Sequence, residues 1–151
     1  MQPAAAASAA ERAQIDALIA EFFRCFDNRG GRVPSVSSMT RLFTPTAAIS
    51  VHAAATPTLH SPADFAAPRV QLLTGGSLVG FHEWEVHATN TVLGPIATRV
   101  SAYAKAGCLN GVDFSGQGTK VFQLVKVAAQ WRILALSWFD DTDGPVAAGQ
   151  A

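Results

Sequence analysis

The sequence is poor in charge and in long apolar runs, and each shortage excludes a class of protein. Only 15% of the 151 residues are charged, and the 11 basic residues balance the 11 acidic ones. A net charge of zero provides no basic surface for nucleic acid or for an anionic membrane. No apolar run reaches the roughly 18 residues that a membrane span requires. We therefore expect no nucleic-acid partner and no membrane partner.

Cysteine is also scarce. Cys25 and Cys108 are the only two, too few for a disulfide scaffold, and they fit a reducing compartment. The first residues lack the basic segment and the leucine-rich segment of a signal peptide. We therefore expect a cytoplasmic protein. No motif in the sequence indicates a cofactor.

What is present favours one folded domain. Hydrophobic residues make up 49% of the chain, enough to bury a sizeable core. Residues 1–7 are mostly alanine, and residues 144–151 are small and uncharged. Neither end has side chains that would contribute much to a core. The composition predicts a single domain over residues 8–143 between two flexible tails.

Three helices are predicted in the first half. An S-x-x-E capping box begins the first at Ser8, and apolar residues then follow at three-four spacing as far as Phe26. A second helix is expected over 35–45. A third is expected over 61–76, with a kink or an interruption at Pro68.

The second half is rich in β-branched and aromatic residues bounded by glycine turns. Strands are predicted there and between the second and third helices, at 46–52, 78–92, 95–106, 118–128 and 130–139. Helices followed by a meander of strands indicate an α+β fold. The simplest arrangement is one antiparallel sheet covered by helices on one side.

Five segments resemble the nuclear transport factor 2-like superfamily, in particular SnoaL-like proteins of unknown function. They are IDALIAEFFRCFD, RLFTPTAAISV, GPIATRVSAY, GTKVFQLVKV and QWRILALSWFDD. The resemblance covers roughly residues 11–141. It implies a cystatin-like cone, in which a curved antiparallel sheet packs on three N-terminal helices around an apolar pocket. It also implies a homodimer formed through the outer face of the sheet.

The same superfamily includes ketosteroid isomerase, but the isomerase residues are not carried over. The resemblance puts Phe22 at the position of a helix tyrosine, Val51 near that of the base, and Gln123 at that of a hydrogen-bonding aspartate. A phenyl ring donates no proton and a valine accepts none. These three residues are therefore candidates for ligand binding, with Gln123 as a donor to a ligand carbonyl.

The polar centre of the chain is the segment FHEWEVH, residues 81–87. Side chains alternate along a strand, so Glu83 and Glu85 should share a face with His87, about 6 to 7 Å apart from one to the next. If the two glutamates are buried together, they form an acid-base pair with Tyr103 as a hydrogen-bond donor. The alternative is a solvent or dimer face on which both carboxylates pair with Arg or Lys of the next strand.

Two further residues are candidates for ligand binding. Arg69, on the third helix, can lie at the mouth of the pocket, with a solvated helix face as the alternative. Trp138 belongs to the apolar face of the last strand, with a place in the core or in a dimer interface as the alternative. No metal site is expected, because His82 and His87 have opposite parity on a strand.

Two classes of function follow. The first is a protein that binds a small apolar or aromatic ligand inside the cone, with proton transfer of the isomerase, cyclase or dehydratase type left open. The second is a non-catalytic domain for dimerisation or protein interaction. The two are compatible, since pairing through the outer sheet face leaves the cone open.

Overall fold

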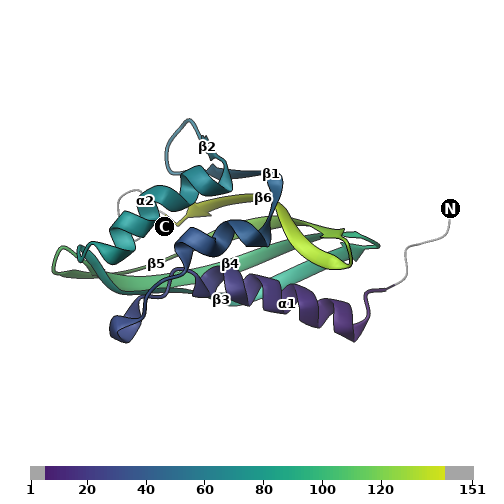
Figure 1. Cartoon of the computed structure of the whole chain (residues 1–151), viewed down its shortest axis with the longest axis horizontal. Helices are drawn as coiled ribbons and strands as arrows, with labels where there is room; N and C mark the ends of the chain where they lie inside the picture. Colours follow the sequence, from purple (N-terminus) through teal and green to yellow (C-terminus); the bar gives the residue numbers. More distant parts are fainter. Residues whose placement is uncertain (1–5, 142–151) are drawn as a thin grey trace.

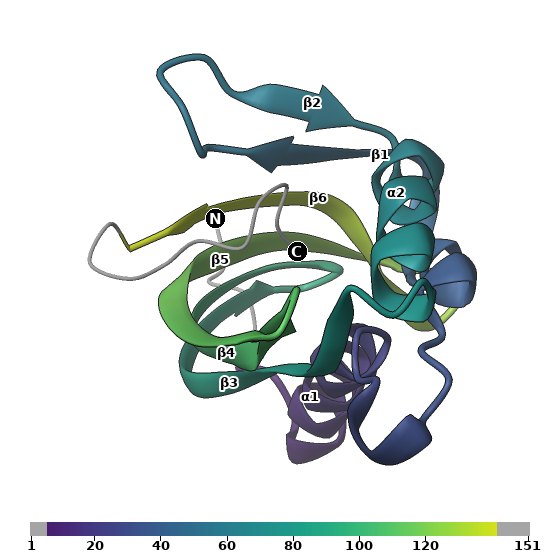
Figure 2. The same cartoon turned by 90° about the vertical axis from the view of Figure 1, so that its left-hand side faces the viewer.

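The structure, a computed structural model, describes residues 6–141 and consists of a curved sheet with helices packed against its concave face (Figures 1 and 2). The expected tails lie outside the described residues, except for residues 6 and 7. In chain order the elements are α1 (Ala9–Arg24), the short 3-10 helices η1 (Arg29–Gly31) and η2 (Val36–Leu42), β1 (Phe43–Val51), β2 (Thr58–His60), α2 (Pro62–Thr74), β3 (Leu78–Leu93), β4 (Ile96–Leu109), β5 (Val112–Val127) and β6 (Gln130–Asp140).

The helices begin where the capping residues predict. Ser8 precedes α1 and accepts a hydrogen bond from the Glu11 amide at 3.1 Å, and Ser61 does the same for the Asp64 amide of α2. Pro68 lies within α2 without ending it. The second predicted helix is the 3-10 helix η2. No helix among residues 6–141 is long and apolar enough to cross a membrane.

The six strands form one sheet in the order β2-β1-β6-β5-β4-β3. Strands β3 to β6 form the predicted antiparallel meander, so the α+β class is confirmed. The expectation of a wholly antiparallel sheet was wrong in one place, because β1 pairs in parallel with β6. This crossover brings the first strand of the chain beside the last one.

The concave face holds the core. Phe22 of α1 is 1% exposed, and its ring packs edge-on against Phe26, Phe43 and Phe122. Such edge-to-face pairs stabilise a core beyond their buried area. Aromatic side chains thus join the helices to the sheet.

The pattern of β3 departs from simple alternation. Phe81, Glu83 and Glu85 share a face, as expected, and that face is the concave one, but His87 is exposed. The register shifts between Glu85 and His87, so one extra residue turns the following side chains over. The prediction that His87 shares the face of the glutamates was therefore wrong.

Candidate functional site

A group of charged and polar side chains, buried or half-buried, lies under the concave face of the sheet. We call it the interior cluster. Strand alternation explains how the sheet delivers its members inward, since Tyr103 and Lys105 share one face of β4, and Lys120 shares a face of β5 with Phe122. The members are Arg69 of α2, Glu83 of β3, Tyr103 and Lys105 of β4, Lys120 of β5 and Asp140 of β6.

Glu83 is the least satisfied member. Its side chain is 1% exposed, and neither carboxylate oxygen has a hydrogen-bond partner among residues 6–141. Its ion-pair partner is Lys120, whose Nζ lies 3.9 Å from Oε1, beyond hydrogen-bonding distance. A buried carboxylate without hydrogen bonds is costly in folding free energy. A carboxylate buried in this way is a candidate catalytic group.

Lys120 is held mainly by aromatic faces. Its Nζ lies 4.0 Å from the ring centroid of Trp138 and 4.1 Å from that of Tyr103. Burial lowers the pKa of Lys120 to about 8, while Glu83 and Asp140 oppose this shift. The neutral amine is therefore more populated near neutral pH than that of an exposed lysine, although the ammonium form still dominates at pH 7.

Asp140 receives two interior donors. The Tyr103 hydroxyl donates to its Oδ1, and Lys105 Nζ donates to its Oδ2 at 2.8 Å. Burial, reinforced by Glu83 and Asp140, raises the pKa of Tyr103 well above its usual range. The phenol therefore keeps its proton. Gly118 makes room for this ring, since a Cβ there would lie 2.9 Å from Tyr103 Cε1.

Arg69 closes the cluster from the helix side. Its guanidinium carbon lies 3.6 Å from the ring centroid of Phe65 and 5.8 Å from that of Trp138. Burial lowers the pKa of Arg69 to about 10, opposed by Glu83. The side chain is 6% exposed, so the alternative of a solvated helix face was wrong.

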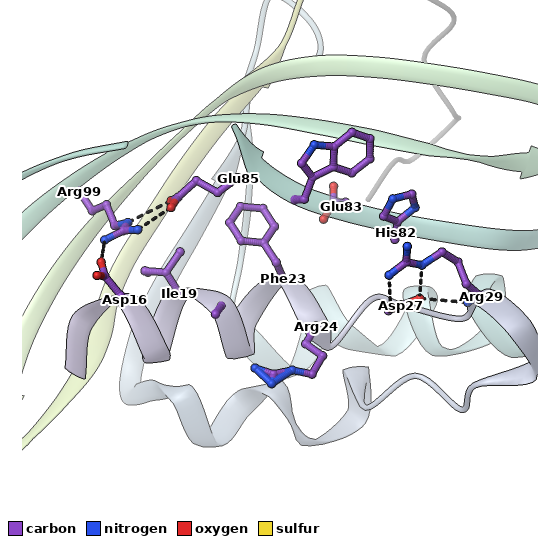
Figure 3. Close-up of a pocket in the computed structure, with 12 residues that line it drawn as sticks. Asp16, Ile19, Phe23, Arg24, Asp27, Arg29, His82, Glu83, Glu85 and Arg99 are labelled. Carbon is purple, nitrogen blue, oxygen red and sulfur yellow. Dashed lines mark hydrogen bonds and ion pairs between the residues drawn. The ribbon is translucent and has the colours of Figure 1, made fainter. Parts of the chain in front are cut away.

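A pocket of about 540 Å³ lies between α1 and β3 (Figure 3). We call it the α1–β3 groove. At one end Arg99 binds Glu85 and Asp16, and at the other Asp27 binds Arg29, with Phe23 between the two ends.

Glu83 connects the groove with the interior cluster. It lines the groove and lies 3.9 Å from Lys120. Phe23 also lines the groove, and its ring centroid is 6.3 Å from that of Tyr103. Both side chains thus border the groove and the interior cluster.

The structure brings four of the predicted site residues together. Glu83, Tyr103, Arg69 and Trp138 all lie at the interior cluster. Val51 is half-buried on β1, in register with Trp138 of β6.

Three predicted site residues lie elsewhere. Glu85 accepts hydrogen bonds from Arg99 Nε at 3.0 Å and from the Ser101 hydroxyl at 2.5 Å, as an ion-paired group rather than as half of an acid pair with Glu83. Phe22 is part of the aromatic core. Gln123 points to the outer face of the sheet, where the Thr98 hydroxyl donates to its Oε1 at 3.1 Å.

Sequence reasoning missed Lys105, Lys120 and Asp140. Strand parity would have found Lys105, because it lies two residues after Tyr103 and therefore on the same face of β4. It gives no such signal for Lys120, because apolar residues lie on both faces of β5. Within residues 6–141, no three His, Cys, Asp or Glu side chains lie close enough together to hold a metal ion.

Comparison with known proteins assigns the fold. No family model matches the sequence, and no curated protein does. The Kfla4162 protein of Kribbella flavida superposes with a TM-score of 0.73 at 15% identity, over 90% of this chain and 93% of that one. An NTF2-like protein with a cystatin-like fold from Novosphingobium aromaticivorans superposes with a TM-score of 0.68 at 19% identity, over 91% of this chain and 84% of that one. A hexachlorocyclohexane dehydrochlorinase, LinA type 2, superposes with a TM-score of 0.70 at 12% identity, over 94% of this chain and 93% of that one. The chain therefore has the nuclear transport factor 2-like, cystatin-like fold.

Proposed function

We propose that this protein binds a small apolar or aromatic molecule through the α1–β3 groove and transfers a proton with Glu83 as the base. The observation that carries the proposal is the Glu83 carboxylate, buried without a hydrogen bond at the inner wall of the groove. A carboxylate without hydrogen-bond donors loses no such partner when it accepts a proton. General-base catalysis of this kind contributes about 10²- to 10⁴-fold in rate.

Other members of the interior cluster have supporting roles in this proposal. The ammonium of Lys120 offsets the negative charge that Glu83 carries before the transfer. Tyr103 stays protonated and holds Asp140 in place beside it. The groove supplies an apolar wall from Ile19 and Phe23 for the substrate. One structure with the same fold is named as a dehydrochlorinase, so elimination chemistry is compatible with this scaffold.

The test is hydrogen-deuterium exchange at carbon. A panel of cyclic and aromatic ketones is incubated with the protein in D₂O, and loss of the C–H signals next to the carbonyl is followed by NMR. We expect the natural protein to accelerate exchange for some members, and Glu83→Gln to lower that rate by about 100-fold or more.

The matched control is Glu21→Gln, which removes a partly exposed glutamate that pairs with Arg41. It should leave the exchange rate unchanged. Exchange that persists in Glu83→Gln would exclude Glu83 as the base. If no ketone exchanges faster than in buffer, the proton-transfer part of the proposal is refuted.

We also propose that two copies pair through the outer face of the sheet, and pairing alone is the alternative function. Val100, Val121 and Phe139 lie on that face and are 40%, 37% and 49% exposed. Val100 and Val121 are direct partners in the β4–β5 register. An apolar patch of this kind on a sheet face marks an interaction surface more often than a solvated one.

We place the protein in the cytoplasm. Cys25 is buried, Cys108 is half-buried, and both thiols are free. A reducing compartment suits this arrangement.

A further inference from the structure

The environment of Lys120 is unusual for a lysine amine. Lys105, its neighbour in the interior cluster, donates a hydrogen bond to Asp140 at 2.8 Å. The carboxylate that pairs with Lys120 lies 3.9 Å from its nitrogen, and the centroids of two aromatic rings lie at 4.0 and 4.1 Å. Rings attract an ammonium but accept no classical hydrogen bond from it. The nitrogen of Lys120 is therefore less tightly held than that of Lys105.

We propose that Lys120 is an amine nucleophile, which condenses with the carbonyl group of an aldehyde or ketone to form an imine beside Glu83. The inference rests on the proposed function and deepens it, because it names carbonyl compounds as the substrate class. A lysine desolvated in an apolar site is a known way of obtaining a reactive amine near neutral pH.

The reaction balances without any further reagent. The neutral amine attacks the carbonyl carbon and forms a C–N bond. The carbonyl oxygen takes one proton from the amine nitrogen and one from the solvent, the C–O bond breaks, and water leaves. The resulting iminium cation stands where the ammonium stood, so Glu83 and the faces of Tyr103 and Trp138 still face a positive charge. Glu83 then accepts a proton from the carbon next to the iminium, and the electron pair of that C–H bond neutralises the nitrogen as an enamine. Reprotonation and hydrolysis release the carbonyl compound and the amine.

The charges around Lys120 bear on its pH dependence. Burial favours the neutral amine, and nearby cations favour it further, whereas the two carboxylates oppose it. Condensation should therefore accelerate as the pH rises through about 8. The ionisable groups that surround the amine are Glu83 from β3, Tyr103 and Lys105 from β4, Asp140 from β6 and Arg69 from α2.

The experiment uses pentane-2,4-dione, which reacts with an amine to give a stable vinylogous amide and one water, with a new near-ultraviolet absorbance. The full chain is incubated with the diketone at several pH values, digested and mapped by mass spectrometry. The sequence has only three lysines, Lys105, Lys120 and Lys126, so the map is unambiguous. We expect an adduct on Lys120 that forms at least 10-fold faster than on the other two lysines. Adducts confined to other amines, equal rates on all three lysines, or no adduct would overturn the inference.

Two variants complete the design. Lys126→Arg changes a half-buried lysine that bonds Glu11, and it should keep the adduct. Lys120→Arg should abolish it, and mapping the natural protein gives the same answer if that variant does not fold. Ketone exchange without a Lys120 adduct overturns this inference and leaves the proposed function standing. A Lys120 adduct combined with exchange that survives Glu83→Gln supports the nucleophile and overturns Glu83 as the base.

Discussion

Glu83 and Lys120 depend on each other at the scale of single residues. Both side chains are 1% exposed, and each is the ion-pair partner of the other at 3.9 Å. A buried ion pair of this kind contributes little net stability, but removing one partner leaves the other uncompensated. The pair thus behaves as one unit in a mutational test.

Lys120→Met should lower the free energy of unfolding by about 3–5 kcal/mol, because the Glu83 carboxylate is left buried and unpaired. The double variant Glu83→Gln/Lys120→Met should recover most of that loss, since neither charge remains. Urea unfolding of both single variants and of the double variant measures the coupling. Additive losses would show that the two side chains do not interact.

The depressed pKa of Lys120 also predicts how stability depends on pH. Between about pH 8 and the ordinary lysine value near 10.4, the unfolded chain binds a proton that the folded chain does not. The free energy of unfolding therefore rises with pH in this window. Relative to the double variant, the natural protein should gain on the order of 1–2 kcal/mol between pH 7 and pH 9.5. If the difference in the free energy of unfolding between the two proteins does not change over that pH range, the lowered pKa of Lys120 is contradicted.

At the scale of helices and strands, one carboxylate, that of Asp27, stabilises the connection from α1 to η1. Oδ1 of Asp27 accepts from the Arg29 amide and Nε at 3.0 Å, and its Oδ2 accepts from Arg32 at 2.7 Å. These donors hold the pKa of Asp27 well below its usual range. The next residue, Asn28, donates to the carbonyls of Leu73 and Leu78, so this connection also joins α2 to β3.

Asp27→Asn should lower the free energy of unfolding by about 1–3 kcal/mol at pH 7. The folded pKa is depressed, so the contribution of Asp27 is present above the ordinary Asp value near 4 and is lost as the pH falls below it. The difference in the free energy of unfolding between the natural protein and the variant should therefore become smaller in acid. The control Asp113→Asn, at an exposed position, should change stability by less than about 0.5 kcal/mol. A gap that is unchanged at pH 3 would count against the proposed linkage.

Helices and meander strands could be predicted from the sequence because their signals are local. Ser8 and Ser61 cap helices through residues three positions away, and alternation marks the long strands. The parallel pairing of β1 with β6 has no local signal, since it depends on strands far apart in the chain. The parity of β5 was equally hidden. Its apolar residues lie on both faces, and burying Gln123 is less costly than burying Lys120, yet the fold does the opposite.

The outer sheet face offers a test at the scale of the whole molecule. If Val121 lies at the centre of a dimer interface, Val121→Glu places two carboxylates against each other across the twofold axis and desolvates both. We expect the natural protein to sediment as a dimer and the variant as a monomer at the same concentration, with unchanged circular dichroism. The control is Val33→Glu, at a position that is 86% exposed near η1. A natural protein that is monomeric at micromolar concentrations would refute the pairing.

The crossover of β1 has a consequence for the order in which the chain can fold during synthesis. A ribosome makes β1 early and β6 last among the six strands. Within the described part of the chain, β6 is the only strand that pairs with β1 besides the three-residue β2. Until residues 130–140 emerge, β1 keeps one edge open, and the carboxylate of Asp140 is missing beside Tyr103 and Lys105. Long-range pairings of this type form slowly, and unpaired edges expose a nascent chain to aggregation. The sheet position of β1 can therefore be completed only after β6 has been synthesised.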